Sequence, residues 1–332
     1  MQRLKMRSQA HQISLIYLPI SNQEAEWLKE DPEVQQILSE SQLYFIGQKP
    51  ESIFAFEENI YEKVKRTKKI PFKIELGELS DEGEINIEKL ISTRNLNLSE
   101  TNLKVELGKK LIRIWDIGLN DAFQEEKRGE YNLLEWYTTE KMITDRSFEP
   151  NHLEGLNNYK SFTCYHLHYI GISKKEDSLK RLVIKPHDKR LRILSNEHPL
   201  EYGSRLTDEL ILFFFNIESI EIKQHELEDN IFDFGKNELE DKIRIIADAE
   251  KAFVKILDTQ YNVVKFKKYP ISYDGLYNSS VERYSYSINN DLTFITPNNK
   301  IRGKRNVVYA QSAFDFIAID KKDETVELIK IE

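Results

Sequence analysis

Residues 210–215 constrain the fold of this chain more than any other segment, because they are six apolar residues in succession. Side chains along a β-strand point alternately to the two faces of a sheet, so a strand that is apolar at every position is buried on both faces. We therefore expect residues 208–217 to form a central strand of a sheet whose two faces are both covered.

Shorter apolar runs and turn signals indicate the other elements. Strands are predicted at residues 12–20, 43–46, 70–76, 111–117 and 161–172. Helices are predicted at residues 21–37, with Ser21 as N-cap and Pro32 as a possible break, and at 85–94, 178–184, 188–194 and 239–257. Alternating apolar residues after residue 277 indicate a β-rich unit, so the expected fold class is α+β.

The length of 332 residues and the hydrophobic content of 40% suit two or three domains. We expect an N-terminal α+β domain over residues 1–130, which carries no catalytic motif and is assigned to recognition or partner binding. A central domain over residues 131–276 holds the candidate chemistry. A β-rich C-terminal unit follows over residues 277–332.

Composition excludes several classes of protein. The lone Cys164 can neither form an internal disulfide nor complete a thiolate zinc site. No apolar run approaches the roughly 20 residues that span a bilayer, and no signal-peptide region follows the first residues, so a cytoplasmic protein without membrane contact is expected. A net charge of -8 argues against a protein that coats nucleic acid with its whole surface.

The charge is nevertheless unevenly distributed. Residues 174–205 hold nine Lys or Arg against five Asp or Glu, a net charge of +4, and four of these residues are candidate nucleic-acid contacts: Lys180, Lys185, Lys189 and Arg190. Mixed charge on a solvated helix face is the alternative. Residues 226–241 hold one Lys and seven acids, which suits either an autoinhibitory or partner-binding insertion or a solvated acidic loop.

Helical periodicity singles out Glu250. In the predicted helix 239–257, Ile243, Ile246, Phe253 and Leu257 define an apolar stripe whose missing member is residue 250. A carboxylate on such a stripe is costly unless it has a partner or binds a cation. Glu250 is therefore expected either at the rim of a pocket or beside a partner there.

A motif precedes this helix. The sequence Tyr169-Ile170-Gly171-Ile172-Ser173 is followed by Arg181 and His187, and Glu250 is followed by Tyr261-Asn262. In order and spacing, these residues resemble the GIY-YIG nuclease superfamily over roughly residues 155–270. The resemblance implies a small core with a central antiparallel sheet flanked by helices, and a divalent cation, Mg²⁺ or Mn²⁺.

The resemblance also implies a role for each matched residue. Glu250 would hold the cation, and Arg181 would stabilise the scissile phosphate. Tyr169 and His187 would position or deprotonate the attacking water, and Asn262 would support the site. A single carboxylate leaves most of the coordination sphere of Mg²⁺ to water and phosphate, which is usual at phosphoryl sites.

The first half of that family's signature is not recognisable before Tyr169. Tyr159 lies ten residues upstream and is the preferred candidate on spacing. Tyr165, on the same strand face as Tyr169, and Tyr137, in a strand displaced by an insertion, are the alternatives.

These patterns predict a divalent-metal-dependent endonuclease that hydrolyses DNA, in restriction or antiviral defence. The alternative is a catalytically degenerate core that binds nucleic acid or protein. A homodimer or an activating protein partner is compatible with either, since one site of this kind must act twice to cut a duplex.

Overall fold

The computed structural model describes residues 7–96, 101–118, 123–174, 176–223, 242–306 and 313–332. The chain divides into two compact units. The first unit combines residues 1–49 with residues 164–332, and the second unit is residues 50–163. The second unit is thus an insertion into the first.

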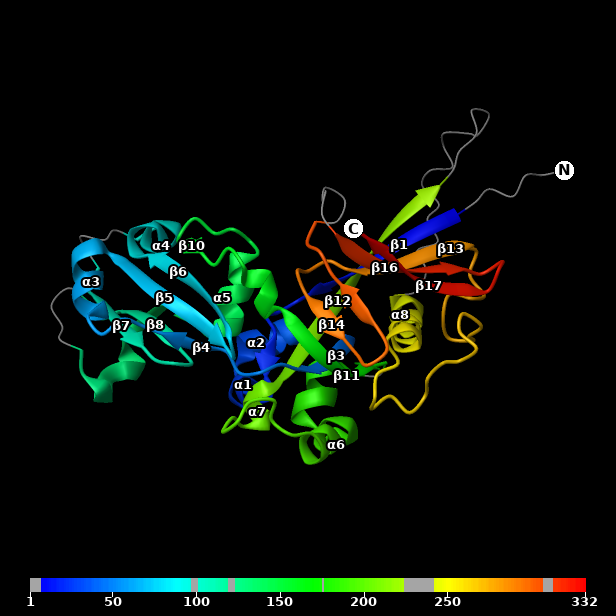
Figure 1. Cartoon of the computed structure of the whole chain (residues 1–332), viewed down its shortest axis with the longest axis horizontal. Coiled ribbons are helices and arrows are strands. Elements are labelled where there is room, and N and C mark those ends of the chain that lie inside the picture. Colours follow the sequence, from blue (N-terminus) through cyan, green and yellow to red (C-terminus); the bar gives the residue numbers. More distant parts are fainter. Residues whose placement is uncertain (1–6, 97–100, 119–122, 175, 224–241, 307–312) are drawn as a thin grey trace. The chain divides into compact units, whose positions relative to one another are not determined.

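A curled sheet of ten described strands organises the first unit (Figure 1). In order along the chain they are β1 (Arg7–Leu15), β2 (Ile20–Ser21), β3 (Leu43–Gln48), β11 (Cys164–Ile172), β12 (Leu210–Lys223), β13 (Arg283–Ile288), β14 (Thr293–Ile295), β15 (Lys300–Arg302), β16 (Phe314–Asp320) and β17 (Thr325–Ile331). Their order in the sheet is β15-β14-β11-β3-β12-β1-β13-β16-β17, with β2 paired to β12. The sheet nearly closes, since Arg302 on β15 binds Asp315 on β16 with Nη2 to Oδ1 at 2.8 Å.

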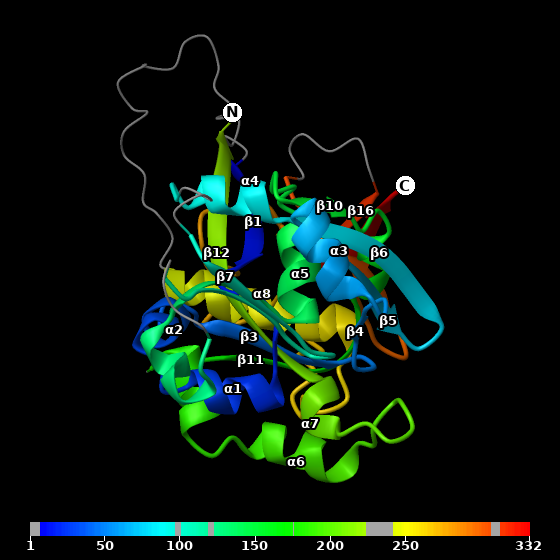
Figure 2. The same ribbon diagram turned by 90° about the vertical axis from the view of Figure 1, so that its left-hand side faces the viewer.

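Helices cover both faces of this sheet at β3, β11 and β12, as expected for residues 208–217. On one face, Phe45 and Phe213 pack in a core that includes Phe253 of α8 (Lys242–Leu257). On the other face, Tyr44 and Phe214 pack in a second core. Its helical residues come from α1 (Asn22–Leu28), α2 (Pro32–Leu38), the π-helical turn η4 (Lys180–Ile184) and α6 (Asp188–Asn196). Figures 1 and 2 both show α8 on one side of β3 and β11, with α1 and α6 on the other.

The N-terminal helices form where the sequence predicts them. Ser21 accepts a hydrogen bond from the Glu24 backbone while the Glu24 side chain binds the Ser21 backbone, which completes a capping box. Pro32 ends the predicted single helix, because it cannot donate a backbone hydrogen bond. It is instead the first residue of α2, which Asp31 caps.

The second unit has two antiparallel sheets, with the orders β10-β6-β5-β4 and β7-β8-β9. Its strands are β4 (Ile53–Ala55), β5 (Lys69–Leu76), β6 (Leu79–Asn86), β7 (Leu103–Leu107), β8 (Ile112–Asp116), β9 (Asn132–Tyr137) and β10 (Leu153–Gly155). The helices α3 (Ile60–Thr67), α4 (Ile87–Thr93) and α5 (Thr139–Arg146) and the short turns η2 (Glu125–Glu130) and η3 (Tyr159–Phe162) complete it. Alternate residues of β5 are buried in the core of this unit.

The α+β class is confirmed, but the units differ from the three consecutive domains predicted. Strand β3 of the predicted N-terminal domain and strands β13–β17 of the predicted C-terminal unit join the same sheet as β11. Local patterns do not reveal which distant strands pair, and this is why the boundaries at residues 130 and 276 do not appear. The acidic residues 226–241 lie outside the described residues. No helix in the described ranges is long and apolar enough to cross a membrane.

The insertion is expected to be dispensable for folding of the first unit. Gln48 of β3 and His166 of β11 are paired, so the ends that flank the insertion lie side by side. Replacing residues 50–163 with a turn of about three residues should preserve a cooperative thermal transition, measured by circular dichroism. Loss of cooperative unfolding in this variant would show that the first unit depends on the second.

Candidate active site

The candidate site is built on the antiparallel pair β3 and β11. Tyr44 lies directly opposite Gly171, and the register shifts between Leu167 and Tyr169. A Cβ atom on Gly171 would lie 2.7 Å from the Tyr44 hydroxyl and 2.6 Å from the ring of Tyr169. Gly171 is therefore required because two tyrosine rings occupy the space where its side chain would be.

The Tyr44 hydroxyl is the centre of a hydrogen-bond cluster. Arg181 Nε donates to it at 3.0 Å, and His187 Nε2 lies 3.0 Å from it. The Tyr169 ring lies beside the Tyr44 ring, with their centroids 6.2 Å apart. Two helical segments and two strands thus converge on this cluster.

His187 has both ring nitrogens engaged. It is the N-cap of α6, where Nδ1 accepts a hydrogen bond from the Arg190 backbone at 3.1 Å. Burial, reinforced by the charge of Arg181, lowers the pKa of His187 to about 4, so the ring is neutral at pH 7. Because Nδ1 accepts, the single proton is on Nε2, and His187 donates to Tyr44.

Arg181 presents its guanidinium group from the π-helical turn η4. Leu182 and Val183 of this turn are buried, whereas the Arg181 residue is exposed. Its Nε binds Tyr44, and its two Nη groups make no hydrogen bond to the described residues. These two donors suit the oxygen atoms of a phosphate.

Glu250 is half-buried on α8 and makes no hydrogen bond or ion pair with any described residue. Burial raises its pKa to about 7, although the charges of Lys251, Lys174 and Arg181 oppose this shift. Its own charge raises the pKa of both Tyr44 and Tyr169, which places Glu250 near the tyrosine cluster. Ile246, Phe253 and Leu257 are buried as the apolar stripe predicts, but Ile243 is 45% exposed.

Asp274 joins two lysines beside Glu250. Its carboxylate binds Lys174 at 2.5 Å and Lys251 at 2.8 Å. Burial acts to raise the pKa of Asp274, but the hydrogen bonds from the two lysines outweigh it and lower the pKa to about 2. The sequence alone does not indicate this arrangement, because Lys174 lies far from Lys251 and Asp274 along the chain and no motif joins the three residues.

Asn262 holds the edge of β11 where β14 no longer pairs with it. Its Oδ1 accepts from the Ile170 backbone N–H at 2.9 Å, and its Nδ2 donates to the Ile170 carbonyl at 2.8 Å. The amide side chain thus substitutes for a strand partner. Asn262 positions β11 and does not contact the tyrosine cluster through any of these bonds.

Tyr159 is not in the unit that holds this cluster. It lies in η3 of the second unit and packs against the core there. Tyr137 is buried in that same unit, where its hydroxyl binds His152, and Tyr165 is buried in the core beneath α8. Tyr44, which the sequence reasoning missed, is the tyrosine that lies beside Tyr169.

A sequence signal for Tyr44 existed, since residues 43–46 were a predicted strand and Gly47 follows them. The signature of the family predicts the first tyrosine just before Tyr169, whereas the strand that carries Tyr44 precedes the whole inserted unit.

The four predicted nucleic-acid contacts all interact with nearby residues of the protein. The structure corrects the prediction for Arg190, because this residue is buried and its guanidinium group binds Asn22, Glu26 and the Leu182 carbonyl. Arg190 therefore holds α6 against α1 and η4. The other three predicted contacts are lysines, and each forms an ion pair with a nearby acidic residue: Lys180 with Asp177, Lys185 with Glu176 and Lys189 with Asp188.

The donor set around Glu250 fits a hard divalent cation held by one protein ligand. An unpaired, half-buried carboxylate is an oxygen ligand of the kind that Mg²⁺ and Mn²⁺ prefer. No group of three or more His, Cys, Asp or Glu in the described ranges could hold a metal ion. A cation at Glu250 would therefore depend on water and substrate for its other ligands.

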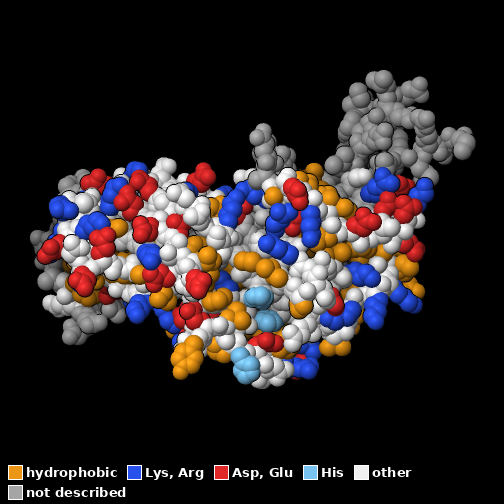
Figure 3. Space-filling model, viewed as in Figure 1, with side chains coloured by type: hydrophobic (Ala, Val, Ile, Leu, Met, Phe, Trp, Pro, Cys, Tyr) orange, Lys and Arg blue, Asp and Glu red, His pale blue; other side chains and the backbone are white. Residues whose placement is uncertain are grey.

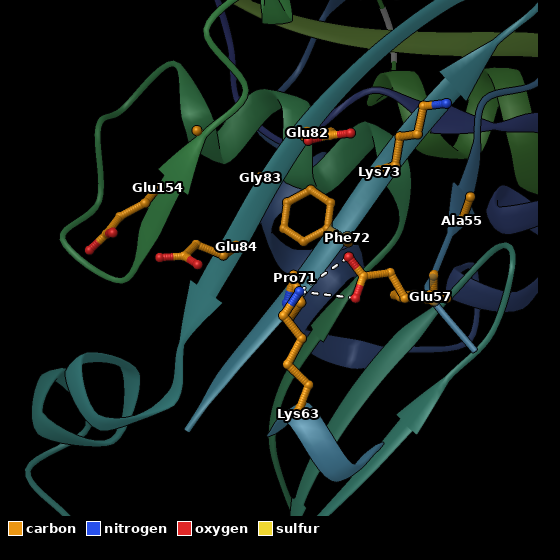
Figure 4. A pocket seen from close by; sticks show the side chains of 12 residues that line it. Ala55, Glu57, Lys63, Pro71, Phe72, Lys73, Glu82, Gly83, Glu84 and Glu154 are labelled. Carbon is orange, nitrogen blue, oxygen red and sulfur yellow. Dashed lines mark hydrogen bonds and ion pairs between the residues drawn. The ribbon is translucent and has the colours of Figure 1, made fainter. Parts of the chain in front are cut away.

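A hollow of about 610 Å³ lies in the second unit (Figure 4). Its charged side chains are matched within the unit, for example Lys63 with Glu57 at 3.0 Å and Glu154 with Lys89 at 2.5 Å. Most of its charged side chains are thus neutralised by neighbours in the same unit.

Comparison with known proteins adds no relative. No protein-family model matches the chain, and no curated protein or solved structure matches it significantly.

The buried His187 predicts a pH dependence of stability. Its pKa is about 4 in the folded protein and about 6.5 when unfolded, so its stabilising contribution is present above pH 6.5 and is lost as the pH falls towards 4. His187→Asn keeps a capping side chain that cannot be protonated. Between pH 7 and pH 4 the free energy of unfolding should fall by about 3 kcal/mol less in this variant, measured with urea. Parallel pH profiles for the two proteins would contradict this.

Proposed function

We propose that the chain is a divalent-metal-dependent endonuclease that hydrolyses DNA phosphodiester bonds, with a core of GIY-YIG type. The observation that carries the proposal is the convergence of Tyr44, Tyr169, Arg181 and His187 on one cluster near Glu250, whose carboxylate has no partner among the described residues. Tyr44 takes the place of the first tyrosine of the signature. A role in restriction or defence rests on the resemblance alone.

Tyr44 is the proposed general base; its side chain is fully buried, so substrate binding must open a path for water to its hydroxyl from the side of the exposed Arg181. Arg181 and His187 both donate to its oxygen and would stabilise the phenolate form. The phenolate takes a proton from water, the water oxygen attacks phosphorus, the bond from phosphorus to the leaving oxygen breaks, and the leaving oxygen takes a proton from solvent. His187 positions Tyr44 in this scheme, because neither of its own nitrogens is free to accept a proton from water.

Arg181 and a cation at Glu250 would both stabilise the negative charge of the phosphate. The free Nη groups of Arg181 would bind the non-bridging oxygens as the phosphoryl group gains charge. A cation bound at Glu250 would polarise the same group as a Lewis acid. Asn262 supports the site by fixing the edge of β11, the strand that carries Tyr169 and Gly171.

Substitution at Tyr44 tests the proposal directly. Tyr44→Phe removes the proposed base and should lower the rate of plasmid cleavage with Mg²⁺ by about 100-fold or more. Glu250→Gln should abolish metal-dependent cleavage while the protein remains folded. The matched control is Tyr159→Phe, which makes the same chemical change in the second unit and should leave the rate unaltered.

Two results would contradict the assignment. Full cleavage by Tyr44→Phe would exclude it as the base, and metal-dependent cleavage by Glu250→Gln would exclude the cation site. DNA binding without cleavage by the unsubstituted protein under any divalent metal would instead favour the catalytically degenerate alternative.

The rate is also expected to rise with pH. Burial keeps the pKa of Tyr44 above its usual value despite the opposing charge of Arg181, so only a small fraction is phenolate at neutral pH. That fraction grows about tenfold for each pH unit below the pKa. Cleavage measured from pH 7 to pH 9 at saturating metal should follow this slope, and the residual activity of Tyr44→Phe should not.

A further inference from the structure

The segment after α8 carries two lysines without an ion pair among the described residues, while its third lysine, Lys265, pairs with Asp258 at 2.9 Å. Residues 259–273 contain three lysines and no acidic residue. Lys267 and Lys268 are exposed, and neither makes an ion pair with a described residue. In Figure 3, Lys and Arg side chains gather at the lower right, where Figure 1 draws this segment in yellow.

This segment begins at the candidate site. Asn262 binds β11, and the residues after it border a hollow of about 390 Å³. Lys251, the neighbour of Glu250 on α8, also lines this hollow. The Lys251 side chain is only 8% exposed, and its ammonium group is held by the Ala247 carbonyl at 2.7 Å and by Asp274. A fixed cation therefore links the site to the hollow.

Hydrogen bonds fix the shape of the segment. Lys255 Nζ donates to the Lys267 carbonyl at 2.8 Å, and the Tyr269 hydroxyl donates to the buried Asp248 at 2.5 Å. Asp248 also accepts from the Leu276 backbone at 2.7 Å. The backbone that presents Lys267 and Lys268 is thus held from both sides, which reduces the entropy lost when a ligand binds.

The same segment also exposes large side chains that are not charged. Val263 is 75% exposed, Val264 is 60% exposed and Tyr273 is 96% exposed. Ser272 lines the hollow, and its buried hydroxyl has no hydrogen-bond partner among the described residues. A segment that exposes both cationic side chains and an aromatic ring suits single-stranded nucleic acid, with phosphates on the cations and a base stacked on the ring.

We infer that residues 263–273 bind a single-stranded stretch of nucleic acid next to the scissile phosphate. Lys267 and Lys268 contact its phosphates, and Tyr273 stacks on an unpaired base. This inference rests on the proposed nuclease function and names the substrate class for that site: a strand with unpaired nucleotides beside the cleaved bond.

Binding without cleavage tests it. In full-length Glu250→Gln without divalent metal, fluorescence anisotropy would measure binding of a labelled oligothymidylate of about 16 nucleotides. Adding Lys267→Glu with Lys268→Glu should weaken binding at least tenfold. It should also reduce the slope of log affinity against log salt by about 1.4, as two lost phosphate contacts require. Tyr273→Ala should weaken binding about tenfold, whereas Tyr273→Phe keeps the ring and the affinity.

The matched control is Lys65→Glu with Arg66→Glu, an equal change of charge at exposed positions of α3. If this control lost as much affinity, the effect of the Lys267 and Lys268 substitutions would reflect only the net charge of the protein, and the inference would be overturned. Unchanged binding by the Lys267 and Lys268 variant, or equal affinity for duplex DNA, would also overturn it. These outcomes leave the nuclease proposal standing, whereas no binding of either DNA by Glu250→Gln itself would overturn both.

Discussion

The antiparallel pairing of β3 with β11 is the contact on which the candidate site depends. It sets Tyr44 against Gly171 and brings Tyr169 to the same cluster. The 114 residues of the second unit, 50–163, separate the two strands along the chain. Closing a flexible loop of that length costs about 3 kcal/mol more than closing a short turn, because the entropy depends only on the logarithm of length. A folded insertion whose ends attach at neighbouring positions reduces this cost further.

This topology explains what the sequence could and could not predict. The two-sided burial of β12 and the N-cap at Ser21 follow from local patterns and are confirmed. The place of Glu250 on the core-facing stripe of α8 follows from helical periodicity in the same way. Tyr44 could not be paired with Tyr169 in the same way, because hydrophobic periodicity identifies a strand but not its neighbour in the sheet. Arg190 shows a second limit of local patterns, which do not reveal the direction of a charged side chain. Its charge suggests an exposed residue that contacts a ligand, but in α6 its guanidinium group points inward and binds Asn22 and Glu26.

Two carboxylates on α8, Asp248 and Glu250, have contrasting local environments. Asp248 is fully buried, and it is satisfied by the Tyr269 and Tyr286 hydroxyls and the Leu276 backbone. Glu250, two residues later, has a raised pKa and no such donors. A partly buried carboxylate without hydrogen-bond donors does not stabilise the fold, because its ionised form is poorly solvated there. A bound cation would compensate for this cost and would explain why a glutamate occupies the position.

The uneven charge of the chain then has a physical consequence for substrate binding. The second unit carries 17 Lys or Arg against 22 Asp or Glu, so its net charge of -5 does not favour phosphate contact. The cations Arg181, Lys174 and Lys251 stand instead around Glu250. In a chain of net charge -8, an anionic strand is repelled at long range and attracted only where such cations are concentrated. Rising salt screens repulsion and attraction alike, so affinity at this site depends on the short-range contacts that the protein holds in place.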